Sequence, residues 1–172
     1  MNAPHSHCHY CGTEHQDHSS HPTCPGCGEI CWINPVPVAV CLTEIIGHNG
    51  QKGILLVDRA LRPQGWALPG GFMERGEDVG EAALRELFEE TGLRPSSGET
   101  EVVGAASVPG GTSVIIYVRT APIREKDLKG FQTNSETHGV QAVFDLEEIE
   151  RAQIVFPMHD QKARWFLGEL NS

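Results

Sequence analysis

The segment from Asp78 to Gly92 is the part of the chain whose local structure the sequence specifies most closely. Asp78, with Glu81 three residues later, has the form of a capping box, in which each side chain accepts a backbone N–H at the start of a helix. Gly92 supplies the left-handed residue that commonly ends a helix, and Pro95 prevents continuation. The sequence therefore predicts one helix with both ends defined.

The charges on this helix are unusual. Glu86, Glu89 and Glu90 stand three and four residues apart, so their carboxylates are surface neighbours that repel one another. Two of them lie in the last turn, where the helix dipole adds roughly 0.3 to 1 kcal/mol of cost per misplaced negative charge. A divalent cation would reverse that cost. Four apolar residues recur at helical spacing and leave the glutamates on the other face: Ala83, Leu84, Leu87 and Phe88.

The glutamates belong to a longer pattern. It reads Gly71, five residues, Glu77, seven residues, and then Arg85-Glu86-Leu87-x-Glu89-Glu90-x-Gly92-Leu93. The alternative is a solvated surface helix that is rich in glutamate. This pattern is, however, similar to the Nudix box at every defining position. The resemblance implies a Nudix hydrolase, an enzyme that cleaves nucleoside diphosphates linked to another moiety, with Mg²⁺ or Mn²⁺ held by the box glutamates.

The resemblance also implies roles for individual residues. Glu86, Glu89 and Glu90 would coordinate the metal, and Arg85 would orient them through charge-assisted hydrogen bonds. The backbone carbonyl of Gly70, in Leu68-Pro69-Gly70-Gly71, would join the metal shell, since glycine permits close backbone approach. Glu77 would be a secondary ligand or a structural partner. Carboxylate ligands, without His or Cys, favour Mg²⁺ or Mn²⁺ at this site.

The group that activates the attacking water is less sharply indicated. Glu136, in a polar segment before a late strand, is the nearest match to the carboxylate that many family members use, but a solvated loop glutamate is an equal alternative. Glu89 or Glu90 could serve instead. Arg59 and Arg62 precede the Gly65-Trp66-Ala67-Leu68 run and are candidates for binding substrate phosphates.

A second metal site is expected near the N-terminus. Four cysteines form two C-x-x-C pairs separated by twelve residues, the spacing of a structural zinc site: Cys8, Cys11, Cys24 and Cys27. Disulfides would need an oxidising compartment, for which the sequence gives no signal. Six nearby histidines could replace a thiolate, although most are expected to be solvated: His5, His7, His9, His15, His18 and His21. Cys31 and Cys41 stand apart from the pairs.

The chain is therefore expected to contain two parts. Residues 1–33 are too short and polar to form an apolar core, so a zinc ribbon is predicted there. Residues 34–172 contain short apolar runs bounded by turns: 38–46, 54–57, 101–108, 113–120 and 140–144. A short helix at 146–151 and a closing helix at 160–170 follow. Strands with segregated helices predict an α+β domain, in agreement with the α/β/α sandwich and mixed sheet that the Nudix resemblance implies.

The net charge of −10 argues against a broad nucleic-acid-binding surface. No run approaches the roughly 18 apolar residues of a membrane span, and no signal peptide is evident. We therefore expect a cytoplasmic protein with a small-molecule nucleotide substrate and no membrane partner. The family resemblance makes a homodimer plausible.

A ribbon, an Asn-Pro connector (Cys27 to Pro35) and a Nudix domain together resemble enzymes that act on NADH, FAD or ADP-ribose. The Ser-Gln-Pro-Trp-Pro-Phe-Pro signature of NADH pyrophosphatases does not occur between Arg94 and Thr120. Pro109 lies about where ADP-ribose pyrophosphatases tend to place a proline, although a proline next to Gly110-Gly111 is equally consistent with a turn. ADP-ribose or FAD is therefore preferred. The alternatives are a nucleotide-sensing or nucleic-acid-binding regulatory module, and a hydrolase of capped RNA, for which a basic groove would be expected.

Overall fold

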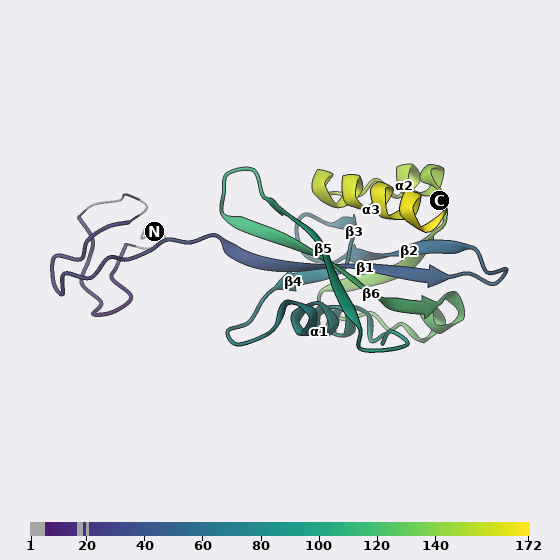
Figure 1. Cartoon of the computed structure of the whole chain (residues 1–172), viewed down its shortest axis with the longest axis horizontal. Helices are drawn as coiled ribbons and strands as arrows, with labels where there is room; N and C mark the ends of the chain where they lie inside the picture. The colour runs from purple at the N-terminus through teal and green to yellow at the C-terminus, as the bar shows by residue number, and fades with distance from the viewer. Residues whose placement is uncertain (1–5, 17–18, 20) are drawn as a thin grey trace. The chain divides into compact units, whose positions relative to one another are not determined.

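The computed structural model describes residues 6–16, 19 and 21–172 (Figure 1). By internal contacts the chain divides into two units, Met1–Pro35 and Val36–Ser172.

The first unit contains two similar turns, each formed by one C-x-x-C pair. The N–H of Gly12 donates to the carbonyl of Cys8 at 2.8 Å, and the N–H of Gly28 donates to that of Cys24 at 2.9 Å. Both glycines have a φ of 77°, a left-handed conformation that glycine adopts without steric cost. Isolated β-bridges, His7 with Glu14 and Thr23 with Ile30, flank the two turns. Of the histidines considered above, His5 and His18 lie outside the described residues.

The second unit is built on one mixed sheet of seven strands, with the core order β3-β2-β1-β6-β5. β1 pairs in parallel with β6, and every other pairing is antiparallel. β4 also pairs with β1, and β7 also pairs with β2. The strands are β1 (Val36–Ile46), β2 (Lys52–Arg59), β3 (Gly65–Ala67), β4 (Gly70–Phe72), β5 (Thr100–Ser107), β6 (Ser113–Arg124) and β7 (Thr137–Val143).

Helices cover both faces of this sheet (Figure 1). α1 (Val79–Thr91) lies on one face, and α2 (Leu146–Ala152) and α3 (Pro157–Leu170) lie on the other. A short 3₁₀ helix, η1 (Glu125–Gly130), follows β6. Successive strand residues point to opposite faces, so Ala39 and Cys41 of β1 pack toward α1 while Val40 and Leu42 pack toward α3.

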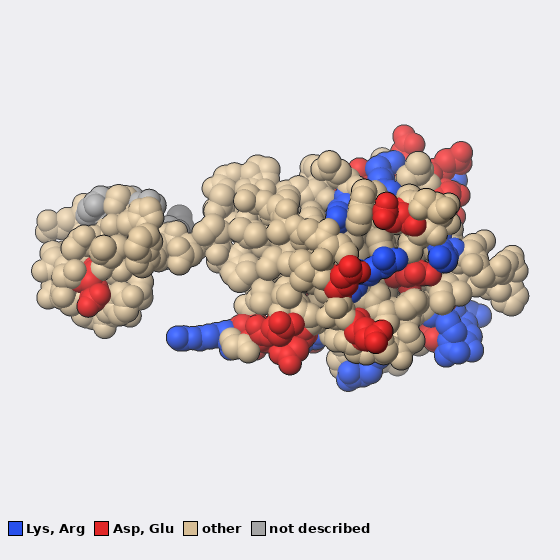
Figure 2. Space-filling model, in the orientation of Figure 1, with Lys and Arg blue, Asp and Glu red and all other residues tan. Residues whose placement is uncertain are grey.

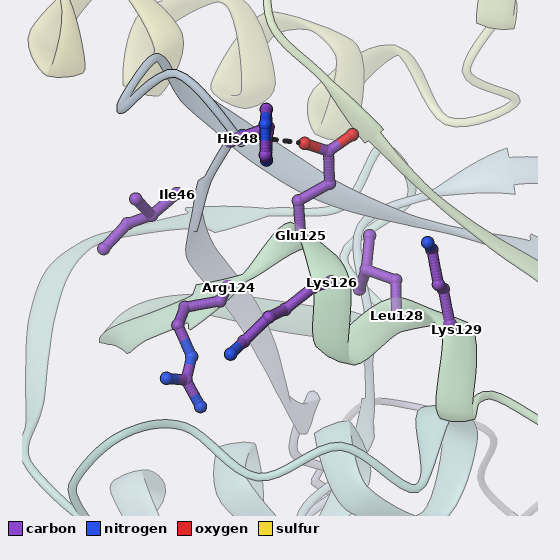
Figure 3. Close-up of a pocket in the computed structure, with 8 residues that line it drawn as sticks. Ile46, His48, Arg124, Glu125, Lys126, Leu128 and Lys129 are labelled. Atoms are coloured by element: carbon purple, nitrogen blue, oxygen red, sulfur yellow. Dashed lines mark hydrogen bonds between the residues drawn. The ribbon is translucent and has the colours of Figure 1, made fainter.

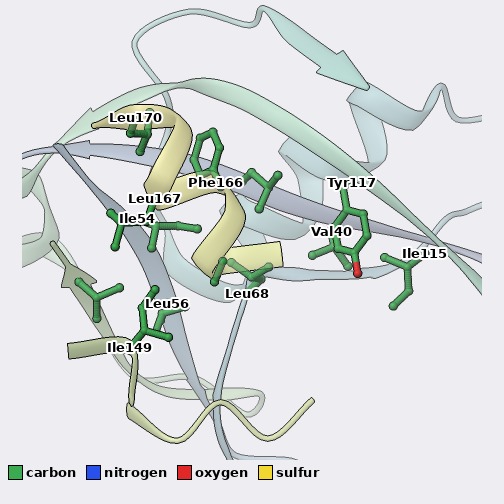
Figure 4. Packing of buried hydrophobic residues seen from close by; sticks show 13 residues of the cluster. Val40, Ile54, Leu56, Leu68, Ile115, Tyr117, Ile149, Phe166, Leu167 and Leu170 are labelled. Carbon is green, nitrogen blue, oxygen red and sulfur yellow. The ribbon is translucent and has the colours of Figure 1, made fainter. Parts of the chain in front are cut away.

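The core beneath α3 is formed by residues distant in sequence (Figure 4). Phe166 and Leu167 of α3 pack in one cluster with Val40 of β1 and Ile54 and Leu56 of β2. The side chain of Phe166 is 1% exposed. The α/β/α sandwich with a mixed sheet, expected from the sequence, is confirmed.

Several local elements differ from expectation. β3 and β4 were not expected, because strands of three residues carry too little alternation to be recognised. β6 continues to Arg124, past the expected end at Thr120. α3 begins at Pro157 instead of Asp160, because proline fits the first turn of a helix, where its missing N–H is not needed.

Within the described ranges, no helix has the combination of length and apolar character that crossing a bilayer requires.

Candidate active site

α1 begins and ends as the sequence predicts. The carboxylate of Asp78 accepts the N–H of Gly80 at 2.8 Å, and Glu81 accepts the N–H of Asp78 at 3.1 Å. Gly92, with a φ of 69°, ends the helix and donates its N–H to the carbonyl of Phe88. These caps fix where the helix begins and ends.

The guanidinium of Arg85 is the centre of the carboxylate cluster. It donates to Glu77 at 2.6 Å, to Glu86 at 2.7 Å and to Glu89 at 2.9 Å, and also to the carbonyl of Phe72 at 3.0 Å. The bonds from Arg85 lower the pKa of Glu77 to about 2. One cation thus compensates part of the repulsion among the carboxylates and fixes their orientation.

Glu90 is hydrogen-bonded to the backbone of β4 and not to Arg85. It is only 5% exposed and accepts the N–H of Gly70 at 2.9 Å. Burial raises its pKa to about 7, and the charge of Glu86 acts in the same direction. Burial likewise raises the pKa of Glu86. These carboxylates are therefore only partly compensated by protein groups, as expected of ligands for a cation.

The simple division of α1 into an acidic face and an apolar face is wrong at two residues. Glu90 is buried, whereas Phe88 is 40% exposed and lies under the guanidinium of Arg94 at 3.9 Å. Glu90 can enter the interior because β4, which it faces, offers a glycine N–H at Gly70.

Two glycines of β4 allow close approaches, Gly70 to β1 and Gly71 to α1. Gly70 has a φ of 150°, and a Cβ atom there would overlap the carbonyl of Ala39 on β1. A Cβ atom on Gly71 would overlap the carboxylate of Glu86. β4 therefore places the backbone expected to join the metal shell directly beside the cluster.

Replacement of Gly71 by Ala is expected to displace the Glu86 carboxylate, because the new methyl group would occupy its position. The expected result is a roughly tenfold or greater loss of metal-dependent rate, the size of effect given by a small misplacement of reacting groups. Gly71 has no positive φ, so we expect thermal stability to change little. Steady-state kinetics and thermal melting would measure the two effects. Gly98→Ala, where a Cβ meets nothing within 4 Å, is the control; equal rates for both variants would contradict the prediction.

Glu136 lies near this cluster in space. Its charge contributes to the raised pKa values of Glu86 and Glu90. Asn134 holds its loop against α1: the amide nitrogen donates to the carbonyls of Glu89 and Glu90 at 3.2 and 3.1 Å, and the amide oxygen accepts the N–H groups of Glu136 and Thr137 at 2.8 Å. Sequence reasoning missed Asn134. Its position two residues before Glu136 was the available signal, since asparagine commonly bonds backbone groups in turns.

A cavity of about 410 Å³ adjoins the two glycines of β4. Its wall is mostly apolar and includes Val38 and Val40 of β1 and Ile115 of β6. Two charged or titratable side chains line it among the described residues, Arg59 and His159. The guanidinium of Arg59 lies over the ring of Phe156, 5.1 Å from its centre.

The two arginines expected to bind phosphate differ in their surroundings. Arg59 lines the cavity, and its charge acts on the pKa values of both Glu90 and His159, so it lies near the carboxylate cluster as well. Arg62 is exposed and does not line the cavity. Its predicted role in substrate binding stays a prediction.

A second hollow, of about 640 Å³, lies at the far end of β1 (Figure 3). Its wall includes Arg124, Lys126 and Lys129, and the carboxylate of Glu125 accepts the N–H of His48 at 3.1 Å. Ile46 in its wall is six residues along β1 from Val40 of the first cavity, which corresponds to about 20 Å of strand. The hollow is therefore separate from the candidate active site.

The four paired cysteines come together in the first unit. The sulfur atoms of Cys8, Cys11, Cys24 and Cys27 all lie within 4.8 Å of one another. Cys31, which the sequence placed apart, has its sulfur 3.4 Å from that of Cys8 and is 3% exposed. Cys41 is fully buried in the other unit, where its thiol donates to the carbonyl of Ala83 at 3.0 Å.

A mixed sheet between helices, with a carboxylate helix packed on a glycine strand, defines an α+β domain suited to holding divalent cations beside an apolar cavity. The chain belongs to the Nudix hydrolase family: the NUDIX domain model matches residues 35–166.

Several known proteins are similar to the chain. An ADP-ribose pyrophosphatase from Methanocaldococcus jannaschii is 59% identical over 59 residues, which are 33% of this chain and 34% of that protein. The crystal structure of a NUDIX hydrolase from Nitrosomonas europaea has a TM-score of 0.71 and 27% identity, and covers 95% of this chain and 91% of that one. The NUDIX domain of Shewanella oneidensis NrtR, complexed with ADP ribose, has a TM-score of 0.61 and 21% identity, over 80% of this chain and 89% of that one. The chain spans less than half the length of the curated relatives that it matches first.

Proposed function

We propose that this protein hydrolyses the pyrophosphate bond of a nucleoside diphosphate derivative in a reaction that depends on Mg²⁺ or Mn²⁺. The observation that carries the proposal is the carboxylate cluster: Glu86 and Glu90 lie against the Gly70–Gly71 backbone, which lines the apolar cavity, and Arg85 joins Glu89 to Glu86. The products would be a mononucleotide and a phosphorylated partner.

The donor set fits the proposed metal. Glu86, Glu89 and Glu90, with the carbonyl of Gly70, would supply hard oxygen ligands, which suit Mg²⁺ or Mn²⁺. The partial burial and raised pKa values of Glu86 and Glu90 mean that a cation would relieve their repulsion. When bound, the metal would polarise the phosphate oxygens and lower the pKa of a water molecule.

Side chains of the protein would position the ligands, bind the substrate and accept the proton. Arg85 holds Glu86 and Glu89 at fixed positions. Arg59 would bind a phosphate oxygen beside the cavity, because a guanidinium presents several donors in a planar fork. Glu136 is the candidate to accept the proton of the attacking water, with Glu89 and Glu90 as the alternatives. The apolar cavity would hold the nucleoside part and exclude water from it.

For the substrate, we infer ADP-ribose or FAD. Support comes from the partial match to an ADP-ribose pyrophosphatase and from a domain of the same fold crystallised with ADP ribose. The face shown in Figure 2 has Lys and Arg side chains among Asp and Glu side chains, without a broad basic field, which disfavours capped RNA as substrate on that face. The regulatory-module alternative would have no need for an intact carboxylate cluster.

The test is turnover of a defined panel by the purified full chain with Mg²⁺. The panel contains ADP-ribose, FAD, NADH, diadenosine polyphosphates and nucleoside triphosphates, and product formation is followed by chromatography. We expect hydrolysis of ADP-ribose or FAD in preference to NADH. Absence of turnover for every compound, with Mg²⁺ or Mn²⁺, would reject the enzyme proposal and favour the nucleotide-sensing alternative.

A further inference from the structure

The imidazole ring of His159 lines the apolar cavity and has no role in the proposed hydrolysis. His159, in the first turn of α3, lines the cavity together with Phe156, Pro157 and Met158. Its residue is 7% exposed, so more than nine tenths of it is buried. A buried histidine in a cavity is either held by protein groups at both ring nitrogens or has one nitrogen available for a ligand.

One ring nitrogen of His159 accepts a hydrogen bond from the protein backbone, whereas the other is not bonded to any described residue. The N–H of Leu68 donates to Nδ1 of His159 at 3.3 Å, so Nδ1 must be the unprotonated nitrogen and Nε2 carries the hydrogen. Nε2 has no hydrogen-bond partner among the described residues. Within that same part of the chain, the fully buried side-chain polar atoms without a partner are His15 Nδ1 and Thr137 Oγ1. His159 Nε2 also lacks a partner but is not among these fully buried atoms, so it is the accessible atom of the ring.

The ring is also kept neutral. Burial lowers the pKa of His159 to about 4, and the nearby charge of Arg59 acts in the same direction. At neutral pH the ring thus presents a fixed tautomer, with a single N–H donor and no charge. Such a group suits a neutral acceptor atom, and it adds little attraction for a phosphate.

Its position is fixed by several contacts. The ring of Phe156 lies 5.0 Å from that of His159, and the hydroxyl of Tyr117 donates to the carbonyl of Met158 at 3.2 Å. A donor that is held in place before binding loses little freedom when the ligand arrives. Among the described residues, the cavity has no acidic side chain in its wall, so His159 meets ligand acceptors without an adjacent competing carboxylate.

We propose that His159 is a specificity-determining residue that donates its Nε2–H to an acceptor atom of the substrate's nucleobase in the cavity. The apolar wall contacts the faces of the base, and the imidazole donates a hydrogen bond to one edge of the base. A ligand with sugar and phosphate but no base does not use this hydrogen bond. The inference rests on the proposed function only in taking the cavity's occupant to be the nucleoside part of the substrate.

Two substitutions separate this role from a structural one. In His159→Asn, the amide oxygen can still accept the N–H of Leu68, but no donor reaches the position of Nε2. In His159→Gln, the amide nitrogen can reach that position, although the contact with Leu68 is lost. Tyr117→Phe is the matched control, because it removes a hydrogen bond to the same turn of α3 but keeps the Nε2–H donor, and so measures the effect of loosening this turn alone.

The measurement is binding by calorimetry with Mg²⁺ present, using AMP and ribose 5-phosphate as probes, so that no turnover is needed. We expect His159→Asn to bind AMP roughly tenfold more weakly, as the loss of one hydrogen bond in a cavity implies. His159→Gln should bind within about threefold of the parent, as should Tyr117→Phe. Binding of ribose 5-phosphate should be the same in all four proteins.

Three results would overturn the inference. They are unchanged AMP binding in a folded His159→Asn protein, an equal loss of AMP and ribose 5-phosphate binding, and failure of the unsubstituted protein to bind AMP. If the variants do not fold, the imidazole ¹⁵N signals of the unsubstituted protein decide: AMP should shift Nε2 and ribose 5-phosphate should not. AMP binding without turnover of the substrate panel would reject the hydrolase proposal alone, whereas turnover with an insensitive His159 would reject this inference alone.

Discussion

Glu90→Gln is expected to lower the metal-dependent hydrolysis rate by roughly two to four decades, the size of effect found when a group that acts in the transition state is removed. The amide has the shape of the carboxylate, and its oxygen can still accept the N–H of Gly70, which Glu90 accepts at 2.9 Å. What it loses is the negative charge that would hold the cation. Steady-state kinetics over a range of Mg²⁺ concentrations would measure the loss.

The thermal stability of the Glu90→Gln protein should not fall with its rate. Glu90 is 5% exposed and has no direct salt bridge to any described residue, and burying a charge without an opposite charge costs free energy. We therefore expect the metal-free Gln variant to melt at or above the temperature of the parent, so that the loss of rate cannot be ascribed to unfolding.

Glu81→Gln is the matched control for this experiment. It makes the same change on the same helix, in the capping box, where a glutamine can still accept the N–H of Asp78. Its rate should stay within about twofold of the parent, since a surface cap contributes to helix stability and not to the cluster. A Glu90→Gln protein that is folded and keeps more than a tenth of the rate would remove Glu90 from the proposed metal site.

Removal of metal from the first unit is expected to unfold residues 1–35 while the second unit stays folded. We propose that the sulfurs of Cys8, Cys11, Cys24 and Cys27, which lie within 4.8 Å of one another, hold one zinc ion. Among the described residues of this unit, the buried cluster consists of cysteines, Cys8, Cys24 and Cys31. Because so small a cluster buries little apolar surface, we expect the folding energy to come from the metal, at roughly 10 to 16 kcal/mol for structural zinc sites. The second unit has its own core on both faces of the sheet.

Elemental analysis of the full chain should find about one zinc per chain. Cys24→Ser should lose it, and NMR signals of the first unit should collapse to those of an unfolded chain, while the melting transition of the second unit persists. Cys31→Ser is the control, because Cys31 is buried beside Cys8 but is not one of the four paired cysteines. A zinc-free protein with a folded first unit would reject the site. Loss of zinc in Cys31→Ser but not in Cys24→Ser would make Cys31 a ligand.

The sequence predicted those features that depend on neighbours along the chain. The limits of α1 follow from the Asp78 and Glu81 cap and from Gly92, and all three act as expected. The hairpins of β1 with β2 and of β5 with β6 were expected from short apolar runs joined by glycine-containing turns. The spacing of the two cysteine pairs likewise predicted the four-thiol cluster that the structure contains.

The arrangement of the candidate active site could not be predicted from neighbours along the chain. Spacing alone placed Glu86, Glu89 and Glu90 on one exposed face, whereas β4 draws Glu90 into the interior and Arg85 gathers Glu77, Glu86 and Glu89. The sequence also gave no reason to connect Asn134 with the last turn of α1, from which it is separated by more than forty residues.

By itself, then, the sequence determined the helix, the box and the cysteine pairs, because capping, turn formation and helical spacing act over three or four residues. Only the tertiary structure decided which carboxylate is buried and where the cavity lies. It also brought Leu68 to His159, ninety-one residues away. The physical reason is that these contacts depend on strand pairing and on packing against both sheet faces, and a local pattern does not encode which distant segments meet.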